Sequence, residues 1–246
     1  MRIAVIADIH GNLEALSAVI ADLKESLPDV VISLGDVVGY GADPQECCDI
    51  VREAAQRNIM GNHDAAAAGV LDTAFFNDDA REAIQWTRGQ ISEPAVSWLR
   101  SSSYTFGYED MLFSHGSPVN PEEFDYVMTI GNVEKAFYAF GAKYKIFFVG
   151  HSHRRFTVSQ KMQGDEAPVV DCSDTVAVEE QRRYIISVGS VGQPRDRDST
   201  ASYGILDTDR RLYTVKRLRY AIKTARDKII KAGLPRWLAD RLMMGV

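Results

Sequence analysis

The N-terminal third of the chain alternates short apolar runs with a segment of helical periodicity. Arg2–Ala7 and Val30–Leu34 are apolar runs of strand length, and both are predicted to be buried strands. Between them, apolar residues recur every three or four positions after Asn12, a suitable helix N-cap, and Pro28 ends this pattern. The order of strand, helix and strand predicts a parallel sheet, in which functional groups gather beyond the carboxyl ends of the strands.

The next segment is predicted to be mostly helical. Asp43, Pro44 and Glu46 have the pattern of a helix start, with Asp43 as N-cap, proline in the first turn and glutamate closing a capping box. A third strand is expected over residues 57–60. From 65 to 101 the clearest helical pieces are 75–88 and 94–99, and we interpret this stretch as a helical insert.

A hairpin, a helix and another buried strand are predicted in the middle of the chain. The hairpin has arms at 103–108 and 111–114 and turns at Glu109 and Asp110. The helix is expected near 133–140, and the buried strand covers 145–149.

The remainder of the chain has strands with partial alternation of apolar and polar residues. These strands favour a second, more antiparallel sheet, and they cover 156–159, 183–188, 202–207 and 212–218. The polar stretch 160–181 is predicted to be a surface hairpin. Amphipathic helices at 220–231 and 235–244 end the chain, and they either pack on the body or form a homodimer contact.

Composition and charge narrow the class of protein. The 246 residues are 46% hydrophobic and 25% charged, which is usual for globular proteins, and we expect one domain over 1–246. A net charge of −6 and a pI of about 5.4 argue against generic binding to nucleic acid or to anionic membranes. The apolar run at 3–7 is too short for a membrane span. Three cysteines without an even framework predict reduced thiols and a cytoplasmic location.

All five histidines follow predicted strands and lie outside predicted helices, beside Gly, Asp or Asn: they are His10, His63, His115, His151 and His153. The carboxylates of Asp8 and Asp36 also lie at strand ends. We interpret Gly61-Asn62-His63-Asp64 as a loop at the end of the third strand, because these four residue types favour neither a strand nor a helix. The sequence therefore predicts that these side chains converge on one cleft.

This group of side chains has the chemistry of a metal site. In extended chain, residues i and i+2 point the same way, so Asp8 with His10, and His151 with His153, are each placed to hold one ion. Imidazole and carboxylate without thiolate suit Mn, Fe, Zn, Ni or Co. Asp36 is well placed to bridge two ions. Asn62 offers a neutral oxygen, which keeps the net charge of the site positive for an anionic substrate.

Five short blocks together resemble the calcineurin-like metallophosphoesterase superfamily: Asp8-x-His10, Gly35-Asp36, Gly61-Asn62-His63-Asp64, His115-Gly116 and Gly150-His151-Ser152-His153. They occur in the family's order. The most similar subgroup is the small bacterial phosphoesterases related to YfcE and to diadenosine tetraphosphatases. The resemblance implies an α/β (α+β) fold, a four-layer αββα sandwich of two mixed β-sheets flanked by helices. It also implies two divalent metal ions between the sheet ends, and Mn is the ion that we expect to support activity.

The resemblance also implies a role for each residue of the blocks. The first metal would be held by Asp8, His10, Asp36 and His153, and the second by Asp36, Asn62, His115 and His151. His63 would be the catalytic residue that is not a ligand, and Asp64 would set its tautomer and orientation. The implied reaction is hydrolysis of a phosphate ester by a hydroxide that the two ions activate, while His63 donates a proton to the leaving oxygen or stabilises its charge.

The sequence signals for residues that bind the substrate are less specific than those for the metal ligands. Arg195, on a glycine-rich loop, is a candidate phosphate contact, and the alternative is a surface loop with Arg–Asp pairs. Tyr40 either lines the cleft or packs in the core, and Arg154 and Arg155 are interpreted as strand residues. In the Ser/Thr protein phosphatases an Asp-Arg-Gly follows the Gly-Asp block. This chain has Gly39-Tyr40-Gly41 in that place and lacks that arginine.

The sequence favours a small phosphorylated substrate, with nucleotides among the candidates. Two further activities within the same superfamily stay open, nucleotide pyrophosphohydrolase and cyclic-nucleotide phosphodiesterase. A non-catalytic scaffold is the alternative outside enzymes, since some members of the superfamily have become interaction modules. Those members lose ligands or the catalytic histidine, whereas this chain keeps each of them.

Overall fold

Two mixed β-sheets form the centre of the molecule, which is described by a computed structural model of residues 1–141, 143–164 and 166–246. In this part of the chain each sheet has six strands. The first sheet has the order β3 (Arg57–Asn58), β2 (Val30–Ser33), β1 (Arg2–Ile6), β11 (Ala201–Asp207), β12 (Leu212–Leu218) and β9 (Thr175–Ala177). The second has the order β4 (Thr105–Tyr108), β5 (Met111–Ser114), β6 (Ile146–Val149), β10 (Arg182–Val188), β7 (Arg155–Lys161) and β8 (Val169–Asp171).

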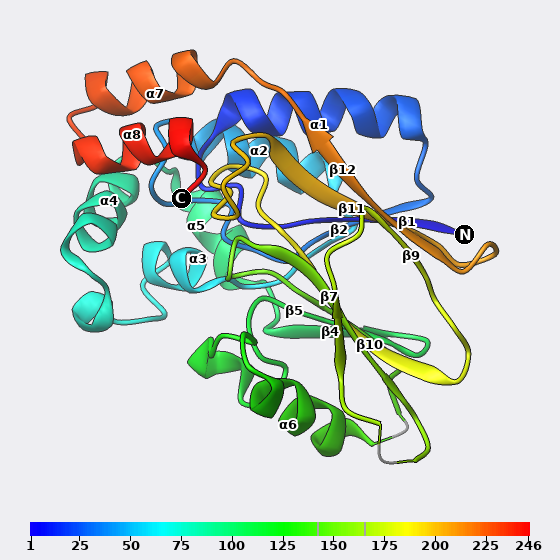
Figure 1. The fold of residues 1–246 in the computed structure, drawn as a ribbon. Coiled ribbons are helices and arrows are strands. Elements are labelled where there is room, and N and C mark those ends of the chain that lie inside the picture. The colour runs from blue at the N-terminus through cyan, green and yellow to red at the C-terminus, as the bar shows by residue number, and fades with distance from the viewer. Residues whose placement is uncertain (142, 165) are drawn as a thin grey trace.

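The two faces of each sheet pack against different layers. In β1, Ile3 and Val5 belong to the cluster between the sheets, whereas Ala4 and Ile6 belong to the cluster under α1 (Leu13–Ser26) and α2 (Pro44–Ala54). In the same way β6 turns Phe148 to the inner cluster and Phe147 towards α6 (Ile130–Phe140). Figure 1 shows α1 and α2 above the sheets and α6 below them. The predicted four-layer αββα sandwich is confirmed.

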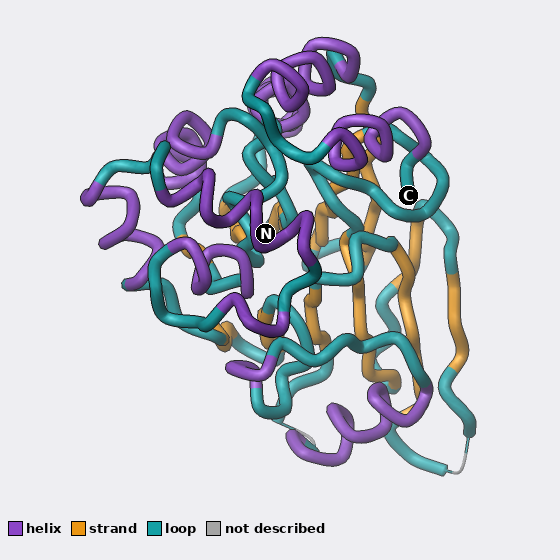
Figure 2. Tube along the Cα trace, turned by 90° about the vertical axis from the view of Figure 1, so that its left-hand side faces the viewer, coloured by secondary structure: helices purple, strands orange, loops and turns teal. Residues whose placement is uncertain are grey.

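The remaining helices cover one end of the sandwich. They are α3 (Asn62–Ala67), η1 (Thr73–Phe75), α4 (Asp78–Arg88), α5 (Glu93–Arg100), the 3-10 turn η2 (Pro121–Glu123), α7 (Ile222–Lys231) and α8 (Arg236–Met244). A separate apolar cluster joins α4, α7 and α8 through Ala83, Ile229 and Leu238. The terminal helices therefore pack on the body of the protein, which was the first of the two predicted alternatives. In Figure 2 the strands lie between helices at the top and the helix at the bottom. Across the described residues, no helix has the length and apolarity that a membrane span requires.

The prediction that four C-terminal strands share a second, more antiparallel sheet is right for β7 and β10 and wrong for β11 and β12. Strand β11 pairs antiparallel with β1 and β12 with β11, so both join the first sheet. Strand β10 pairs parallel with β6 and antiparallel with β7 in the second sheet. Alternation along a strand reports which faces are buried but not which strand lies beside it, so the pattern alone did not identify the partners.

The stretch 160–181 also differs from the predicted hairpin. Its first part does form an antiparallel pair, between β7 and β8. It then crosses to the first sheet, where β9 pairs with β12. Residue 165, within this stretch, lies outside the described residues.

Two predicted helix caps have different outcomes. The side chain of Asn12 accepts a hydrogen bond from the Ala15 N–H at 3.1 Å, which confirms it as the N-cap of α1. Asp43 precedes α2 but its side chain makes no capping bond. Its two oxygens instead accept from Lys228 Nζ of α7 at 3.0 and 2.9 Å. The predicted capping box at Asp43 is therefore wrong, because a tertiary ion pair takes the carboxylate.

We predict that Asn12→Ala lowers the free energy of unfolding by about 2–4 kcal/mol. Asn12 caps α1 and also donates to the buried Gly192 carbonyl at 2.8 Å, so the variant loses a cap and leaves an acceptor unsatisfied. The control is Asn77→Ala. The Asn77 side chain caps α4 by accepting from the Ala80 N–H, so this substitution should lower the free energy of unfolding by only about 0.5–2 kcal/mol. Urea unfolding with unchanged m-values measures both, and equal losses would contradict the prediction.

Candidate metal centre

Loops after the parallel strands of both sheets meet at one edge of the sandwich. Asp8 and His10 follow β1, Asp36 follows β2, and the His10 N–H donates to the Asp36 carbonyl at 2.9 Å. From the second sheet, His151 follows β6, and its N–H donates to both carboxylate oxygens of Asp8 at 3.1 Å. The expected convergence of strand ends is therefore confirmed, and the contacts link the two sheets.

Several residues of this centre have a left-handed backbone, which is uncommon for residues other than glycine. The φ angles are 54° at Asp8, 51° at His10, 52° at Asp36, 62° at His151 and 56° at His153. Such conformations cost about 1–3 kcal/mol each and cluster at functional sites, where surrounding structure maintains them. These turns direct the side chains inward, so the extended backbone assumed for the i, i+2 pairs is absent.

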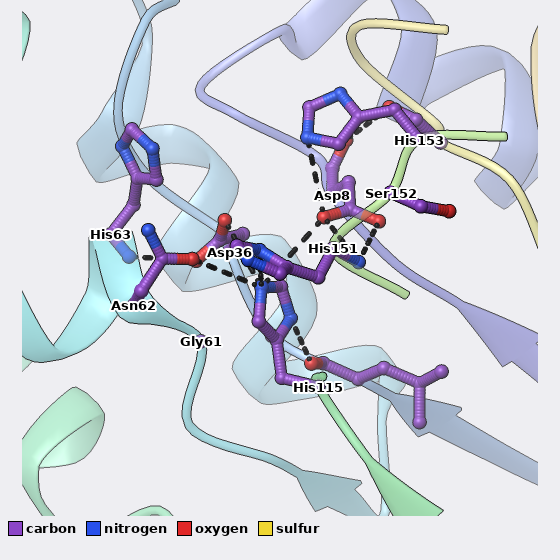
Figure 3. A network of polar contacts seen from close by, with 12 residues as sticks. Asp8, Asp36, Gly61, Asn62, His63, His115, His151, Ser152 and His153 are labelled. Carbon is purple, nitrogen blue, oxygen red and sulfur yellow. Dashed lines mark hydrogen bonds and ion pairs between the residues drawn. The ribbon is translucent and has the colours of Figure 1, made fainter. Parts of the chain in front are cut away.

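Carboxylate and imidazole atoms form two buried groups that share Asp36. One group contains Asp8, His10, Asp36 and His153, and the other contains Asp36, His115 and His151. Asn62 adjoins the second group, with its Oδ1 3.2 Å from His115 Nε2. Figure 3 shows Asn62, His115 and His151 around Asp36, and His153 beside Asp8.

The two predicted i, i+2 pairs have different outcomes. Asp8 and His10 lie in one group, as expected, but His151 and His153 belong to different groups. The prediction that His151 and His153 hold one ion is therefore wrong. The left-handed turns at both histidines separate their rings, and the division between the groups is the one that the family resemblance implied.

Backbone carbonyls fix the orientation of three imidazole rings. Nδ1 of His10 lies 3.1 Å from the Val38 carbonyl, Nδ1 of His115 lies 2.8 Å from that of Leu34, and Nδ1 of His153 lies 2.6 Å from that of Gln193. A carbonyl only accepts, so each Nδ1 carries a proton and the Nε2 of each ring faces the centre, where it is a metal ligand once it is unprotonated. Metal-binding histidines commonly donate the N–H of their other ring nitrogen to a carbonyl in this way.

The centre as it stands needs a positive charge. Nε2 of His10 and Nε2 of His153 lie 3.0 Å apart. When both rings are neutral with the proton on Nδ1, neither Nε2 carries a proton, so no hydrogen bond joins the two atoms. The buried Asp36 Oδ2 accepts no hydrogen bond, although it lies 3.5 Å from His10 Nε2 and 3.3 Å from His115 Nε2. Lone pairs and an unsatisfied carboxylate oxygen that face each other fit divalent cations.

The pKa shifts in the centre support the same conclusion. Burial opposes charge on His115, but Asp36 outweighs it and raises the pKa of His115 to about 9. Burial also opposes the charge of Asp36, yet the neighbouring histidines His115 and His63 hold its pKa well below the usual value. Burial lowers the pKa of His151 to about 3 and of His63 to about 4. An ionised carboxylate that raises the pKa of His115, beside two imidazoles whose pKa burial lowers, is the electrostatic setting of a cation site.

His63 lies in a helix, so the predicted loop over Gly61–Asp64 is wrong. Asn62, His63 and Asp64 form the first turn of α3, and the His63 N–H donates to Asp36 Oδ1 at 2.8 Å. A Cβ on Gly61 would lie 2.1 Å from Asp36 Oδ1, so glycine is required at this position. The sequence pattern missed this helix because it has only six residues, too few for a periodic pattern.

Asp64 does not orient the His63 ring, and this part of the prediction is also wrong. Asp64 Oδ1 accepts from the Val37 and Val38 N–H groups at 2.9 and 3.2 Å, while the buried His63 Nδ1 has no hydrogen-bond partner. Adjacent residues on a helix do not face each other, which explains the separation. Asp64 instead holds the turn whose Val38 carbonyl orients His10.

A small pocket of about 160 Å³ opens onto this centre. It is lined by both predicted substrate-binding residues, Arg195 and Tyr40, together with His63. The Tyr40 ring lies 4.6 Å from that of His10 and 4.4 Å from that of His63, and Arg195 lies 5.8 Å from the Tyr40 ring. Tyr40 thus both lines the pocket and packs on the histidines.

Two aromatic residues of the pocket were missed from the sequence. Tyr126 stacks on His151 with ring centroids 4.0 Å apart, and Phe76 stacks on His63 at 5.1 Å. Both line the pocket. Tyr126 lies outside the motifs and the periodic segments, and Phe76 lies in the predicted helix 75–88, whose pattern gave no sign that this ring faces the pocket.

Comparison with known proteins identifies the class. The model of the calcineurin-like phosphoesterase superfamily domain matches residues 1–211, and the chain belongs to this superfamily. The Asp and His groups of the centre fit a metal-dependent phosphoesterase of this kind.

Individual relatives cover nearly the whole chain. An uncharacterized protein of Methanocaldococcus jannaschii, MJ0912, is 37% identical over 99% of this chain and 98% of its own. A metallophosphoesterase from Sphaerobacter thermophilus has a TM-score of 0.85 and 37% identity, covering 100% of this chain and 99% of its own. The hypothetical protein PH1004 of Pyrococcus horikoshii shares the fold at a TM-score of 0.79 and 20% identity, with 100% and 98% covered. Structural neighbours also include YfcE and a putative diadenosine tetraphosphatase.

We predict that Mn²⁺ stabilises the protein and that Asp36→Asn removes this effect. At a metal concentration of 100 times Kd, binding to the folded state adds about 2.7 kcal/mol, which raises Tm. Asn keeps the size of Asp36 and can still accept from His63, but it lacks the charge. The control is Asp43→Asn. The Asp43 carboxylate pairs with Lys228 outside the centre, so this variant should keep the rise in Tm with Mn²⁺. Melting curves with and without Mn²⁺ test this, and an undiminished shift in Asp36→Asn would contradict it.

Proposed function

We propose that the protein hydrolyses phosphate esters with two divalent metal ions. The observation that carries this proposal is the position of Asp36, which belongs to both ligand groups and has an unsatisfied oxygen towards the histidines of each. One ion would be held by Asp8, His10, Asp36 and His153, and the other by Asp36, Asn62, His115 and His151. Because the donors are nitrogen and oxygen atoms only, we propose that Mn²⁺ is the ion that supports activity. We also propose that the protein is cytoplasmic.

The charge balance of this centre suits an anionic substrate. Two divalent ions against the carboxylates of Asp8 and Asp36 leave a positive centre, because Asn62 contributes a neutral oxygen. When bound, the ions would lower the pKa of water and offset charge on the phosphoryl oxygens. The chain's own part is to hold the ligands rigidly, through carbonyl contacts at His10, His115 and His153.

His63 and Arg195 are proposed to act on the substrate. His63 is only 4% exposed and lines the pocket, and its ring stacks on Phe76 and packs against the tilted ring of Tyr40. We assign it to the leaving oxygen, as proton donor or as hydrogen-bond donor. Arg195 is held by Gln193 Oε1 at 2.7 and 3.2 Å and lines the pocket, where we assign its guanidinium to the phosphoryl oxygens.

Asp64 and Tyr40 are proposed to position other residues. Asp64 fixes the turn at Val37 and Val38, and Tyr40 packs on the rings of His10 and His63. Neither needs to touch the reacting phosphoryl group. Their role is therefore to limit the motion of the groups that do.

We predict that the purified protein with Mn²⁺ hydrolyses p-nitrophenyl phosphate, its bis ester, or both. A chelator should abolish release of nitrophenol, and added Mn²⁺ should restore it, because metal binding is reversible. A preference for the bis ester identifies a diesterase. Absence of hydrolysis of both esters across Mn²⁺, Zn²⁺, Co²⁺ and Ni²⁺ would reject the proposal in favour of a non-catalytic scaffold.

We predict that His63→Ala lowers turnover by about 10²-fold or more while metal content stays at the wild-type value. The His63 contact with Asp36 comes from the backbone N–H, which alanine retains, so the ligands should keep their places. Turnover of the more reactive ester and metal content by mass spectrometry give the two readouts. Unchanged turnover in metal-replete His63→Ala would rule out a catalytic role.

A further inference from the structure

A second, larger cavity adjoins the small pocket at Arg195. Its volume is about 640 Å³, against about 160 Å³ for the pocket, and Arg195 lines both. It is enclosed by the segment that enters α6, by β7, by the edge strand β8 and by the loop after β10. The Arg195 N–H donates to the His153 carbonyl at 3.1 Å, so the loop after β10 is tied to the segment that leads into β7. A group in this cavity and a group in the small pocket would therefore both lie against Arg195.

The wall of this cavity is apolar and yet open to solvent. Met128, Ile130 and Val170 are 48%, 42% and 55% exposed, and all three line it together with Phe156. Large apolar side chains gathered in one exposed hollow mark a binding surface more often than chance exposure does. A flat apolar body, such as an aromatic ring system, is the chemistry that such a wall accepts.

The same cavity carries positive charge that the protein does not neutralise. Arg154 and Arg197 line it, and within the described residues neither guanidinium has an ion pair or a hydrogen bond to a side chain. The carboxylate of Asp196, which also lines the cavity, forms an ion pair with Arg217. Arg155 is also satisfied, by Asp174 at 2.9 Å. In a chain with net charge −6, this local excess of arginine favours an anion.

We propose that this cavity binds the second half of the substrate, a group that carries a ring system and at least one further phosphate. The inference rests on the function proposed above. The small pocket would take the phosphoryl group that reacts, the apolar wall would hold the ring, and Arg154 and Arg197 would bind the additional phosphate. The substrate class is then a nucleotide-type phosphodiester or phosphoanhydride rather than a simple phosphate monoester.

The test is a binding measurement that needs no turnover. AMP is titrated into the full-length protein by calorimetry in the presence of a chelator, with adenosine and ribose 5-phosphate as matched probes that lack the phosphate and the ring, respectively. We expect AMP to bind at least tenfold more tightly than either probe. The double variant Arg154→Ala/Arg197→Ala should weaken AMP binding at least tenfold.

The control variant removes the same charge elsewhere. Arg52→Ala/Arg210→Ala deletes two exposed arginines that lie outside the cavity and should bind AMP as the wild type does. AMP binding no tighter than that of either probe, or equal in the wild type and Arg154→Ala/Arg197→Ala, would overturn the proposal. Failure of the proposed function is seen separately: the wild type would bind AMP as expected but release no nitrophenol from either ester with any of the four metals.

Discussion

The buried charge of Asp36 is the constraint on which the rest of the centre depends. This carboxylate is 1% exposed, so its charge persists only because the His63 N–H and the neighbouring histidines, His115 above all, stabilise it. The first turn of α3 supplies one N–H through His63, and Gly61 leaves room for Oδ1. The other oxygen faces His10 and His115 without a hydrogen bond. A buried carboxylate oxygen without a hydrogen bond is costly, and a divalent cation would remove that cost.

The backbone, more than the side chains, sets the geometry of the ligands. Three carbonyls orient His10, His115 and His153, and those carbonyls come from loops that follow β2 and β10. The loops are in turn bound to one another, as when the Gly192 N–H donates to the Asp8 carbonyl at 2.9 Å. A Cβ on Gly192 would lie 1.7 Å from the Ile9 carbonyl oxygen, so the two loops approach as closely as backbone permits. The centre is thus a property of both sheets together.

Much of the fold and most of the site could be predicted because both depend on strong, local sequence patterns. Buried strands ended in Asp8, Asp36, His115 and His151, and parallel strands bring such ends to one edge. What the sequence could not specify was spatial: which strands lie beside each other, and which way side chains turn after a strand. Asp64 illustrates this limit, since its neighbour in sequence is His63 but its partners in space are the N–H groups of Val37 and Val38.

The C-terminal helices show how residues outside the family match still shape the site. The match to the family ends at residue 211, before α7 and α8. Yet Leu238 of α8 packs in one apolar cluster with Tyr40, and Lys228 of α7 binds Asp43 at the end of the same loop. That loop also provides the Val38 carbonyl that orients His10. The helices therefore brace the ligand-bearing loop from outside, and their packing is coupled to the centre through Tyr40 rather than through any ligand.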